Sequence, residues 1–330
     1  MRIGYACINL ELREREIYTT RTLILASIEK KGLEEAKRLA LLNIKDLAEV
    51  IKHNESLGIR FFRLTSNLFP HMENPQLLKR GIDGEYGIAF AKEELAAAGA
   101  LAKKYGHRIT MHPGQYAQLG STNPDVIAQT ARDLTLHAEI FLAMGLRPEL
   151  GSVMIIHGGG TFGDKAAAIE RWKANFRKLP QHVSQFIALE NDEFQYSVLD
   201  LLPLCEELSI PLCIDFFHHS VKHAAEFNIF EPSILRRVLS TWKLRGIKPK
   251  CHWSNQRPNA RPGTHDDCVD EIPATLLKWC AAENVDCMLE VKLKDQCVKS
   301  ILQKQFVRIE HIVKDEDGKN TIRVEWLPRL

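Results

Sequence analysis

The sequence lacks the paired cysteines of a zinc-binding or disulfide-based scaffold. No Cys-x-x-Cys pair occurs among its eight cysteines, and several of them stand inside apolar runs such as PLCIDF and DCMLE. Cysteines in such runs are typical of small buried hydrophobic residues. A chain of 330 residues can bury a substantial core without a disulfide or a structural metal. We therefore expect a protein of a reducing compartment whose cysteines serve packing.

Long apolar runs are also missing. No stretch is long enough to cross a bilayer, and the apolar part of the first segment, MRIGYACINLELRERE, is too short for a signal peptide. We expect a soluble protein without a membrane partner, located in the cytoplasm, or in the nucleus if the source is eukaryotic.

No charge of one sign dominates. The formal net charge is +2 at pH 7. This balance neither requires nor excludes a nucleic acid partner, because a DNA-binding surface could still be a local basic patch. The sequence does not fix the oligomeric state, and we expect a monomer.

A glycine-rich G-x-G-x-x-G turn is absent after the first strand-like run, which argues against a nucleotide cofactor and a doubly wound open sheet. Instead, short apolar strands alternate with longer amphipathic stretches, the pattern of a parallel sheet covered by helices. The predicted strands cover residues 2–6, 59–65, 107–112, 152–157, 186–190, 211–215, 249–253 and 287–291. Eight such units predict a single α/β domain, a (β/α)8 TIM barrel, over residues 1–305. Residues 306–330 are a C-terminal extension of unknown role.

Ionisable side chains stand at the carboxyl ends of six successive strands. Those ends form one rim of a barrel, where catalytic groups are placed. Two further histidines follow in the loops after the sixth and seventh strands. Histidines and carboxylates without a matching set of arginines favour divalent metal over an ion-pair network. The predicted metal ligands are His112, His157, Glu190, Asp215, His218, His252, His265 and Glu290.

Eight ligands exceed the needs of one ion, so we expect two or three metal ions with a bridging carboxylate. Glu190 lies midway around the rim and is the predicted bridge. Imidazole and carboxylate ligands suit Zn²⁺ or Mn²⁺, and the ligand types do not separate the two.

Lys250 precedes His252 by two residues and should face the same side of its strand. Burial beside metal ions should lower the pKa of this amine. A neutral amine could bind CO₂ and become a carbamate ligand. The alternative is a salt bridge from Lys250 to Glu290 or Asp215.

An ordered set of motifs runs through the chain: RIGYACIN, RLTSNLFP, MHPGQY, HGGGTFGDK, LENDE, CIDFFHH, KCHWS and LEVKLKD. Together they resemble the UV damage endonucleases, TIM-barrel DNA-repair enzymes related in architecture to endonuclease IV. The resemblance extends from residue 2 to about residue 300. A single motif such as HGGG is weak evidence for the family, and the ordered set is what makes the resemblance specific.

This resemblance implies an enzyme that nicks double-stranded DNA immediately 5′ of ultraviolet photoproducts, leaving a 3′-hydroxyl and a 5′-phosphate. It implies a centre of three metals, with Mn²⁺ as the expected ion and Zn²⁺ or Mg²⁺ as alternatives. The catalytic group would comprise Glu190, Asp215, His252 and Lys250.

The resemblance also assigns the recognition of damage. Gln115 and Tyr116 would probe the damaged duplex, with Tyr5 nearby at the rim. Relatives carry a histidine where this chain has Asn74, and His71 might take its place. Arg257 and Arg261, in the long loop after the seventh strand, could hold phosphates or be solvated surface charges.

Three other functions remain open from the sequence. An abasic-site endonuclease of the endonuclease IV type would share the barrel and the metals. A metal-dependent sugar isomerase would share them too, but would not need the Gln-Tyr pair. A non-enzymatic sensor of DNA damage would not need so full a set of ligands.

Overall fold

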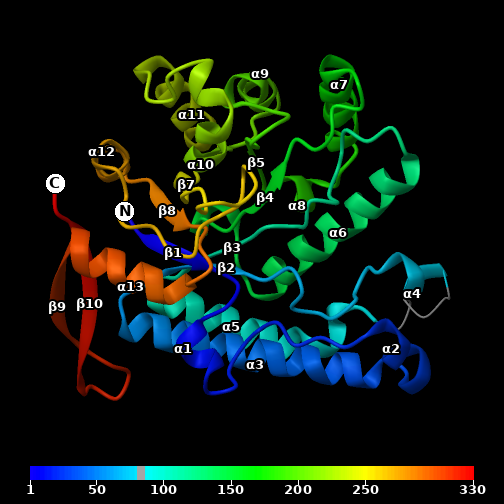
Figure 1. Cartoon of the computed structure of the whole chain (residues 1–330). Helices are drawn as coiled ribbons and strands as arrows, with labels where there is room; N and C mark the ends of the chain where they lie inside the picture. Colours follow the sequence, from blue (N-terminus) through cyan, green and yellow to red (C-terminus); the bar gives the residue numbers. More distant parts are fainter. Residues whose placement is uncertain (80–85) are drawn as a thin grey trace.

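Eight parallel strands form a closed barrel in the computed structural model, which describes residues 1–79 and 86–330. Each strand pairs with the next along the chain, and β8 pairs with β1 to close the ring (Figure 1). The (β/α)8 prediction is confirmed. The strands are β1 (Ile3–Ala6), β2 (Phe61–Leu64), β3 (Arg108–Met111), β4 (Met154–His157), β5 (Ile187–Glu190), β6 (Leu212–Asp215), β7 (Lys250–Trp253) and β8 (Asp286–Leu289).

Helices surround the barrel on the outside (Figure 1). The longest, α3, packs against α5, and both cover the side of β1 to β3. The α-helices are α1 (Leu10–Arg13), α2 (Leu25–Lys31), α3 (Glu34–Ser56), α4 (Pro75–Lys79), α5 (Lys92–Tyr105), α6 (Pro124–Ala143), α7 (Lys165–Phe176), α8 (Gln181–Ser184), α9 (Val198–Leu208), α10 (Phe216–Val221), α11 (Pro232–Lys243), α12 (Ala274–Ala282) and α13 (Lys294–Gln305).

The strand register places the predicted ligands side by side. His157 is the register partner of Glu190 across β4 and β5, and Asp215 is the partner of His252 across β6 and β7. Because neighbouring strands lie about 4.8 Å apart, these side chains meet at one rim. The pairing of short strands thus brings together residues that lie far apart in the sequence.

The C-terminal residues form an antiparallel hairpin, β9 (Phe306–Lys314) and β10 (Asn320–Pro328). In Figure 1 it lies on the left, beside α13 and near both chain ends. Trp326 Nε1 donates a hydrogen bond to the carbonyl of Leu57, and Arg60 donates one to the carbonyl of Val324. Each bond is 2.8 Å long. A hollow of about 530 Å³ is lined on one side by the hairpin. Its other lining residues include Arg2 and Lys248, which precede β1 and β7. The hairpin therefore covers the face opposite the rim of predicted ligands.

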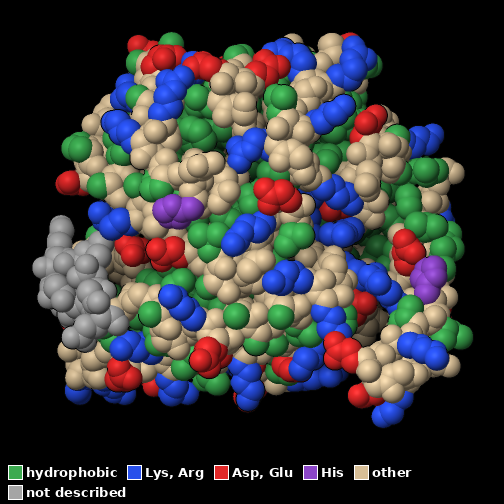
Figure 2. All heavy atoms as spheres, turned by 180° about the vertical axis from the view of Figure 1, so that it is seen from behind, with side chains coloured by type: hydrophobic (Ala, Val, Ile, Leu, Met, Phe, Trp, Pro, Cys, Tyr) green, Lys and Arg blue, Asp and Glu red, His purple; other side chains and the backbone are tan. Residues whose placement is uncertain are grey.

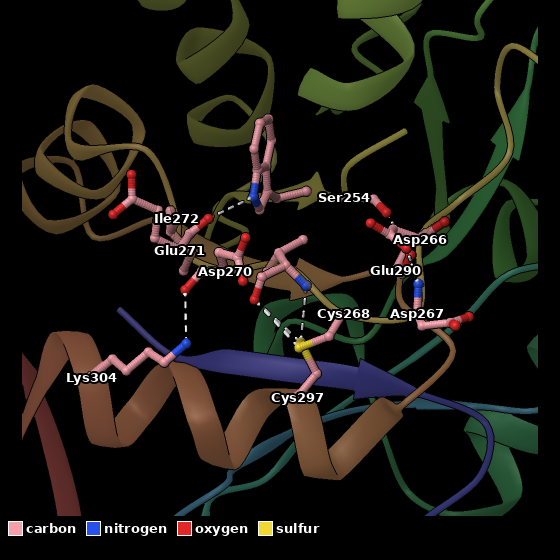
Figure 3. The surroundings of a disulfide bond; sticks show 12 residues. Ser254, Asp266, Asp267, Cys268, Asp270, Glu271, Ile272, Glu290, Cys297 and Lys304 are labelled. Atoms are coloured by element: carbon pink, nitrogen blue, oxygen red, sulfur yellow. Dashed lines mark hydrogen bonds between the residues drawn. A yellow bond between two sulfur atoms is a disulfide. The ribbon is translucent and has the colours of Figure 1, made fainter. Parts of the chain in front are cut away.

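The cysteine prediction is wrong for two residues. Cys268, in the loop after β7, is bonded to Cys297 of α13 (Figure 3). Cys205, Cys213, Cys251, Cys280 and Cys287 are free and buried, as their apolar surroundings predict. The missed pair is separated by 29 positions, a spacing that carries no recognisable signal.

The surface carries mixed charges. Figure 2 shows lysine and arginine side chains interspersed with aspartate and glutamate over the face seen from behind. This agrees with a net charge near zero. In the described part of the chain, no helix has the length and apolar character needed to cross a membrane.

We predict that Gly99→Ala destabilises the fold. In a helix interior, alanine is normally more stabilising than glycine by about 1 kcal/mol, so the expected effect is opposite to the helix propensity. A β-carbon at Gly99 of α5 would lie 1.8 Å from the backbone oxygen of Met144, at the end of α6. Relieving this clash must separate two packed helices, which costs about 1–3 kcal/mol. Urea unfolding measures the difference. Gly87→Ala is the control, since nothing lies within 4 Å of its β-carbon position. Equal stability of the two variants would contradict the prediction.

Candidate metal centre

Glu190 lies at the centre of a cluster of histidines and carboxylates. It is fully buried at the end of β5. One carboxylate oxygen, Oε2, lies 3.0 Å from His112 Nε2 and 3.8 Å from His157 Nε2. The other, Oε1, lies 2.5 Å from His252 Nδ1 and 4.0 Å from His218 Nδ1. The two oxygens therefore face different sets of nitrogen atoms, the arrangement expected of a bridging ligand.

Among the residues that the structure describes, three overlapping groups of side chains could each hold a metal ion, and all three contain Glu190. In each group the potential ligand atoms lie within 4.8 Å of one another. The structure thus brings together seven of the eight predicted ligands. The groups are His112, His157 and Glu190; Glu190, Asp215 and His218; and Glu190, His252 and Glu290.

His265, the eighth predicted ligand, stands at the edge of the cluster. Its Nε2 lies 3.7 Å from Glu290 Oε2, and its ring packs 5.7 Å from that of His218. It comes from the long loop after β7, which the disulfide at Cys268 ties to α13. Sequence reasoning placed this residue correctly at the rim, although it completes none of the three groups.

The protonation states suit metal binding. Burial alone would raise the pKa of Glu190, but the imidazoles of His252 and His157 outweigh it and hold this pKa well below its usual range. Burial lowers the pKa of His252 to about 4, so its ring is neutral at pH 7. Burial also lowers the pKa of His157 and of His265. Neutral imidazoles and ionised carboxylates are the forms that bind metal.

The pKa values of Asp215 and His218 are both raised. Burial raises the pKa of Asp215 to about 7. Burial would lower the pKa of His218, but the carboxylates of Asp215 and Glu190 outweigh it and raise this pKa to about 10. A charged imidazole here partly balances the buried carboxylates. A metal ion would replace that charge, and binding would release the proton.

Unpaired buried atoms show that the cluster fits a cation. Asp215 Oδ2 is buried without a hydrogen-bond partner, and so are the Nδ1 atoms of His157 and His265. An unpaired buried carboxylate oxygen is costly. Because Asp215 Oδ2 faces His218 and His252 at 3.8 and 3.9 Å, a divalent ion among these atoms would satisfy it. The residues at the rim could therefore hold divalent metal ions.

Lys250 is buried in the barrel beneath this cluster. Its Nζ contacts His252 Nε2 and lies 5.6 Å from the ring centre of Phe61. Among the described residues, no carboxylate lies within ion-pair distance of Nζ, so the predicted alternative of a salt bridge to Glu290 or Asp215 is wrong. Burial lowers the pKa of the amine.

Arg63 is a member of the cluster that sequence reasoning missed. It lies on β2, and its guanidinium contacts Glu290 Oε1. Burial alone would raise the pKa of Glu290, but the neighbouring Arg63 and His252 outweigh it and hold this pKa well below its usual range. The signal was the second arginine of the run IRFFRLT, which lies among apolar residues, because a buried cation needs a counter-charge.

Asn191, the residue after Glu190, was missed as well. Its side chain exchanges two hydrogen bonds of 2.9 Å with the backbone of Asp215, and its carbonyl oxygen lies 3.0 Å from His218 Nδ1. It thereby fixes the relative positions of β5 and the start of α10. The asparagine in LENDE was the available signal.

An open hollow of about 710 Å³ lies above the cluster. We call it the metal hollow. Its lining includes His112, His157, His218, His265 and Glu290, together with the loop residues Gln115 and Tyr116. Tyr116 is 80% exposed and Gln115 is also exposed. Thr130 of α6 anchors this loop, since its hydroxyl accepts from the Gln118 amide over 3.0 Å. The Gln-Tyr pair thus stands at the mouth of the metal hollow.

Two expected rim residues lie elsewhere. Tyr5 is 0% exposed, and its hydroxyl bonds to Asn54 and Asn9, so the prediction that it probes DNA at the rim is wrong for this structure. His71 does not take the place of a ligand at Asn74. Its Nε2 bonds to the Leu23 carbonyl and its Nδ1 lies 3.1 Å from the Asn74 amide, so both ring nitrogens are engaged away from the cluster.

The two arginines of the long loop differ. The guanidinium of Arg257 makes two hydrogen bonds, of 2.8 and 2.9 Å, to the carboxylate of Asp267. Its charge is therefore already balanced. Arg261 is exposed. A phosphate-binding role for either residue stays a prediction.

Comparison with known proteins gives a consistent result. Residues 1–319 match the family described as UV-endonuclease UvdE. A protein of Acanthamoeba polyphaga mimivirus, also named for UV-damage endonuclease activity, is 43% identical over 323 residues, which cover 97% of this chain and 94% of that protein. The UV-damage endonuclease of Schizosaccharomyces pombe is 37% identical over 92% of this chain, but this chain spans only 50% of its length.

A solved structure agrees with these relatives. The crystal structure of SacUVDE superimposes with a TM-score of 0.76 at 30% sequence identity, and the match covers 91% of this chain and 96% of SacUVDE. Fold, family match and identity over nearly the whole length all point the same way. The chain belongs to the UV-endonuclease family.

Proposed function

We propose that this protein nicks double-stranded DNA immediately 5′ of ultraviolet photoproducts, both cyclobutane pyrimidine dimers and 6-4 photoproducts. The products would carry a 3′-hydroxyl and a 5′-phosphate. The observation that carries the proposal is the cluster centred on Glu190, which opens into the metal hollow beside an exposed amide and an exposed aromatic ring. The substrate is proposed from the names of the relatives, which are UV-damage endonucleases.

Phosphodiester hydrolysis requires an attacking water, neutralisation of the phosphate charge and stabilisation of the leaving oxygen. Two or three divalent ions at the three groups would supply all of these functions. We infer Mn²⁺ as the ion, with Zn²⁺ or Mg²⁺ as alternatives. Because a metal-activated water would attack the phosphate, this mechanism needs no serine or cysteine nucleophile.

The protein groups have separate tasks. Glu190 would bridge, because its two oxygens face different nitrogen sets. Asp215 and His252 would complete neighbouring groups, and Arg63 would hold the carboxylate of Glu290. We propose that Lys250 carries CO₂ as a carbamate, since its amine is buried, lacks a carboxylate partner and contacts His252.

Damage recognition would rest on the loop after β3. The reacting phosphate must reach recessed groups, so the damaged nucleotides have to leave the base stack. Photoproducts pair and stack poorly, and extruding them costs less than extruding normal bases. Gln115 and Tyr116 would fill the space left in the duplex. We further propose that the protein acts as a monomer, in the cytoplasm or nucleus.

The proposed function is tested with oligonucleotide duplexes that contain one photodimer, one abasic site or no damage. We expect a single cut 5′ of the photodimer, little cutting at the abasic site and none in undamaged DNA. Preferred cutting at the abasic site would favour an enzyme of the endonuclease IV type. Binding without cutting would favour a damage sensor, and no binding would contradict the proposal.

We predict that Glu190→Gln abolishes nicking and lowers the amount of bound metal. A neutral amide cannot bridge two divalent ions through charged oxygens. Elemental analysis and a nicking assay measure both effects. Glu206→Gln, which changes an exposed glutamate of α9, is the control and should leave both unchanged. Near-normal activity with a full metal content would rule out the bridging role.

We predict that Lys250→Ala loses nicking activity and that millimolar short-chain carboxylates partly restore it, because they can occupy the position of the carbamate. The assay compares activity with and without added carboxylate. Lys278→Ala, at an exposed position of α12, should neither lose activity nor respond. An inactive Lys250→Ala that no carboxylate restores would argue for a plain amine.

We predict that replacing both Gln115 and Tyr116 by alanine leaves metal content and melting temperature nearly unchanged, since both side chains are exposed. Nicking of a photodimer in duplex DNA should fall roughly tenfold to a hundredfold, because base–aromatic stacking is worth about 1–3 kcal/mol. The defect should shrink when the bases opposite the lesion are unpaired. Parental activity on ordinary duplex would show that the pair is only a loop feature.

A further inference from the structure

The glycines of the HGGG segment pack against side chains at the rim. The predicted metal centre uses only His157 of this segment. A β-carbon at Gly158 would lie 2.6 Å from the ring of Tyr196, and one at Gly160 would lie 3.1 Å from the ring of Phe162. Gly159 has φ +85° and lies close to the side chain of Gln118. The glycines therefore let the loop after β4 approach its neighbours closely.

Phe162 is held in an unusual conformation. Its φ is +52°, in the left-handed region that a bulky residue rarely adopts, yet its side chain is 46% exposed. The loop is closed by a hydrogen bond of 3.0 Å from the Asp164 amide to the Thr161 carbonyl. The Arg171 guanidinium lies 5.8 Å from the ring centre. Backbone strain that gains no burial is typical of functional loops.

A second hollow, of about 640 Å³, is lined by both Phe162 and Tyr116. Tyr116 and Gln118 line both this hollow and the metal hollow, so the two are neighbours. The start of α6 contributes Asn123, Val126 and Gln129. We call this space the aromatic hollow.

Three polar side chains of the aromatic hollow are engaged within the protein, and the side chains of Thr122 and Asp125 line it as well. Gln118 donates to the Gln115 carbonyl, Asn123 caps α6, and Gln129 donates to the Glu73 carbonyl. Tyr116 and Phe162, both exposed, are the lining residues that can offer a ligand a flat aromatic face. Such a site suits a flat ring, and it would discriminate little among such rings by their edges.

We propose that Phe162 and Tyr116 form a stacking site for an unpaired nucleobase of the DNA substrate, separate from the metal hollow. The proposal rests on the proposed function for its substrate. Extruding a lesion leaves unpaired bases both beside it and opposite it, and every base offers a flat face for stacking. Phe162 would be a substrate-binding residue that contributes to the stability of the opened duplex.

The decisive variant is Phe162→Asn. Asparagine tolerates the left-handed conformation, so the loop should keep its shape while the ring is lost. We expect unchanged metal content and an equal or higher melting temperature, with nicking of a photodimer in duplex DNA reduced about fivefold to a hundredfold. Phe162→Tyr should retain activity. Leu244→Asn, which removes an exposed apolar side chain that lines neither hollow, is the control and should match the parent.

The fluorescence of 2-aminopurine, which is quenched by stacking, shows which unpaired base of the DNA occupies the proposed stacking site. The probe is placed opposite the photodimer in one duplex and 3′ of it in the same strand in another. Quenching that the parent shows and Phe162→Asn loses, at either position, supports the proposal and identifies the source of the base.

Two results would overturn it: parental nicking and quenching by Phe162→Asn, or a loss of stability or metal in that variant. If the parent itself cuts no damaged DNA, the proposed function fails instead, so the two failures are distinguishable.

Discussion

The structure depends on how the buried carboxylate of Glu190 is compensated. A carboxylate with no exposure inside a barrel is unstable unless cations or hydrogen bonds surround it. Here His112 and His252 contact its two oxygens, and the imidazoles hold its pKa low. Because each oxygen faces a different set of nitrogens, the same arrangement that stabilises the charge also prepares a bridging ligand.

The barrel makes this arrangement possible. Each strand contributes four residues, and the parallel register brings their ends to the same level. His157 and Glu190 are register partners, as are Asp215 and His252. The loops after the strands supply His265 at the edge of the cluster and the exposed Gln115 and Tyr116. The barrel thus sets the spacing of the cluster, and the segments after the strands complete it.

Much of this was predictable from local patterns. Eight short apolar runs gave the strands, and ionisable residues at their ends gave the cluster, because side-chain direction in a strand follows a period of two. The pairing of Cys268 with Cys297 was not predictable, since it depends on how a long loop meets α13. Nor was the burial of Tyr5, whose hydroxyl finds Asn54 on α3.

Other misses came from patterns that were visible but not used. Arg63 inside an apolar strand required a buried counter-charge, and Glu290 provides it. The salt bridge considered as an alternative for Lys250 is absent for a related reason: Arg63 pairs with Glu290, whereas the amine of Lys250 contacts His252. Charges in a barrel have to be assigned together, because each pairing removes a partner from the others.

The central claim is that Glu190 is the carboxylate shared by several metal ions. Anomalous diffraction from crystals grown with Mn²⁺ and recorded on both sides of the manganese absorption edge tests it most directly. The account predicts at least two anomalous peaks that each lie within bonding distance of a Glu190 oxygen and of one neighbouring histidine or carboxylate group. A single peak that does not contact Glu190, or peaks only outside this cluster, would contradict it.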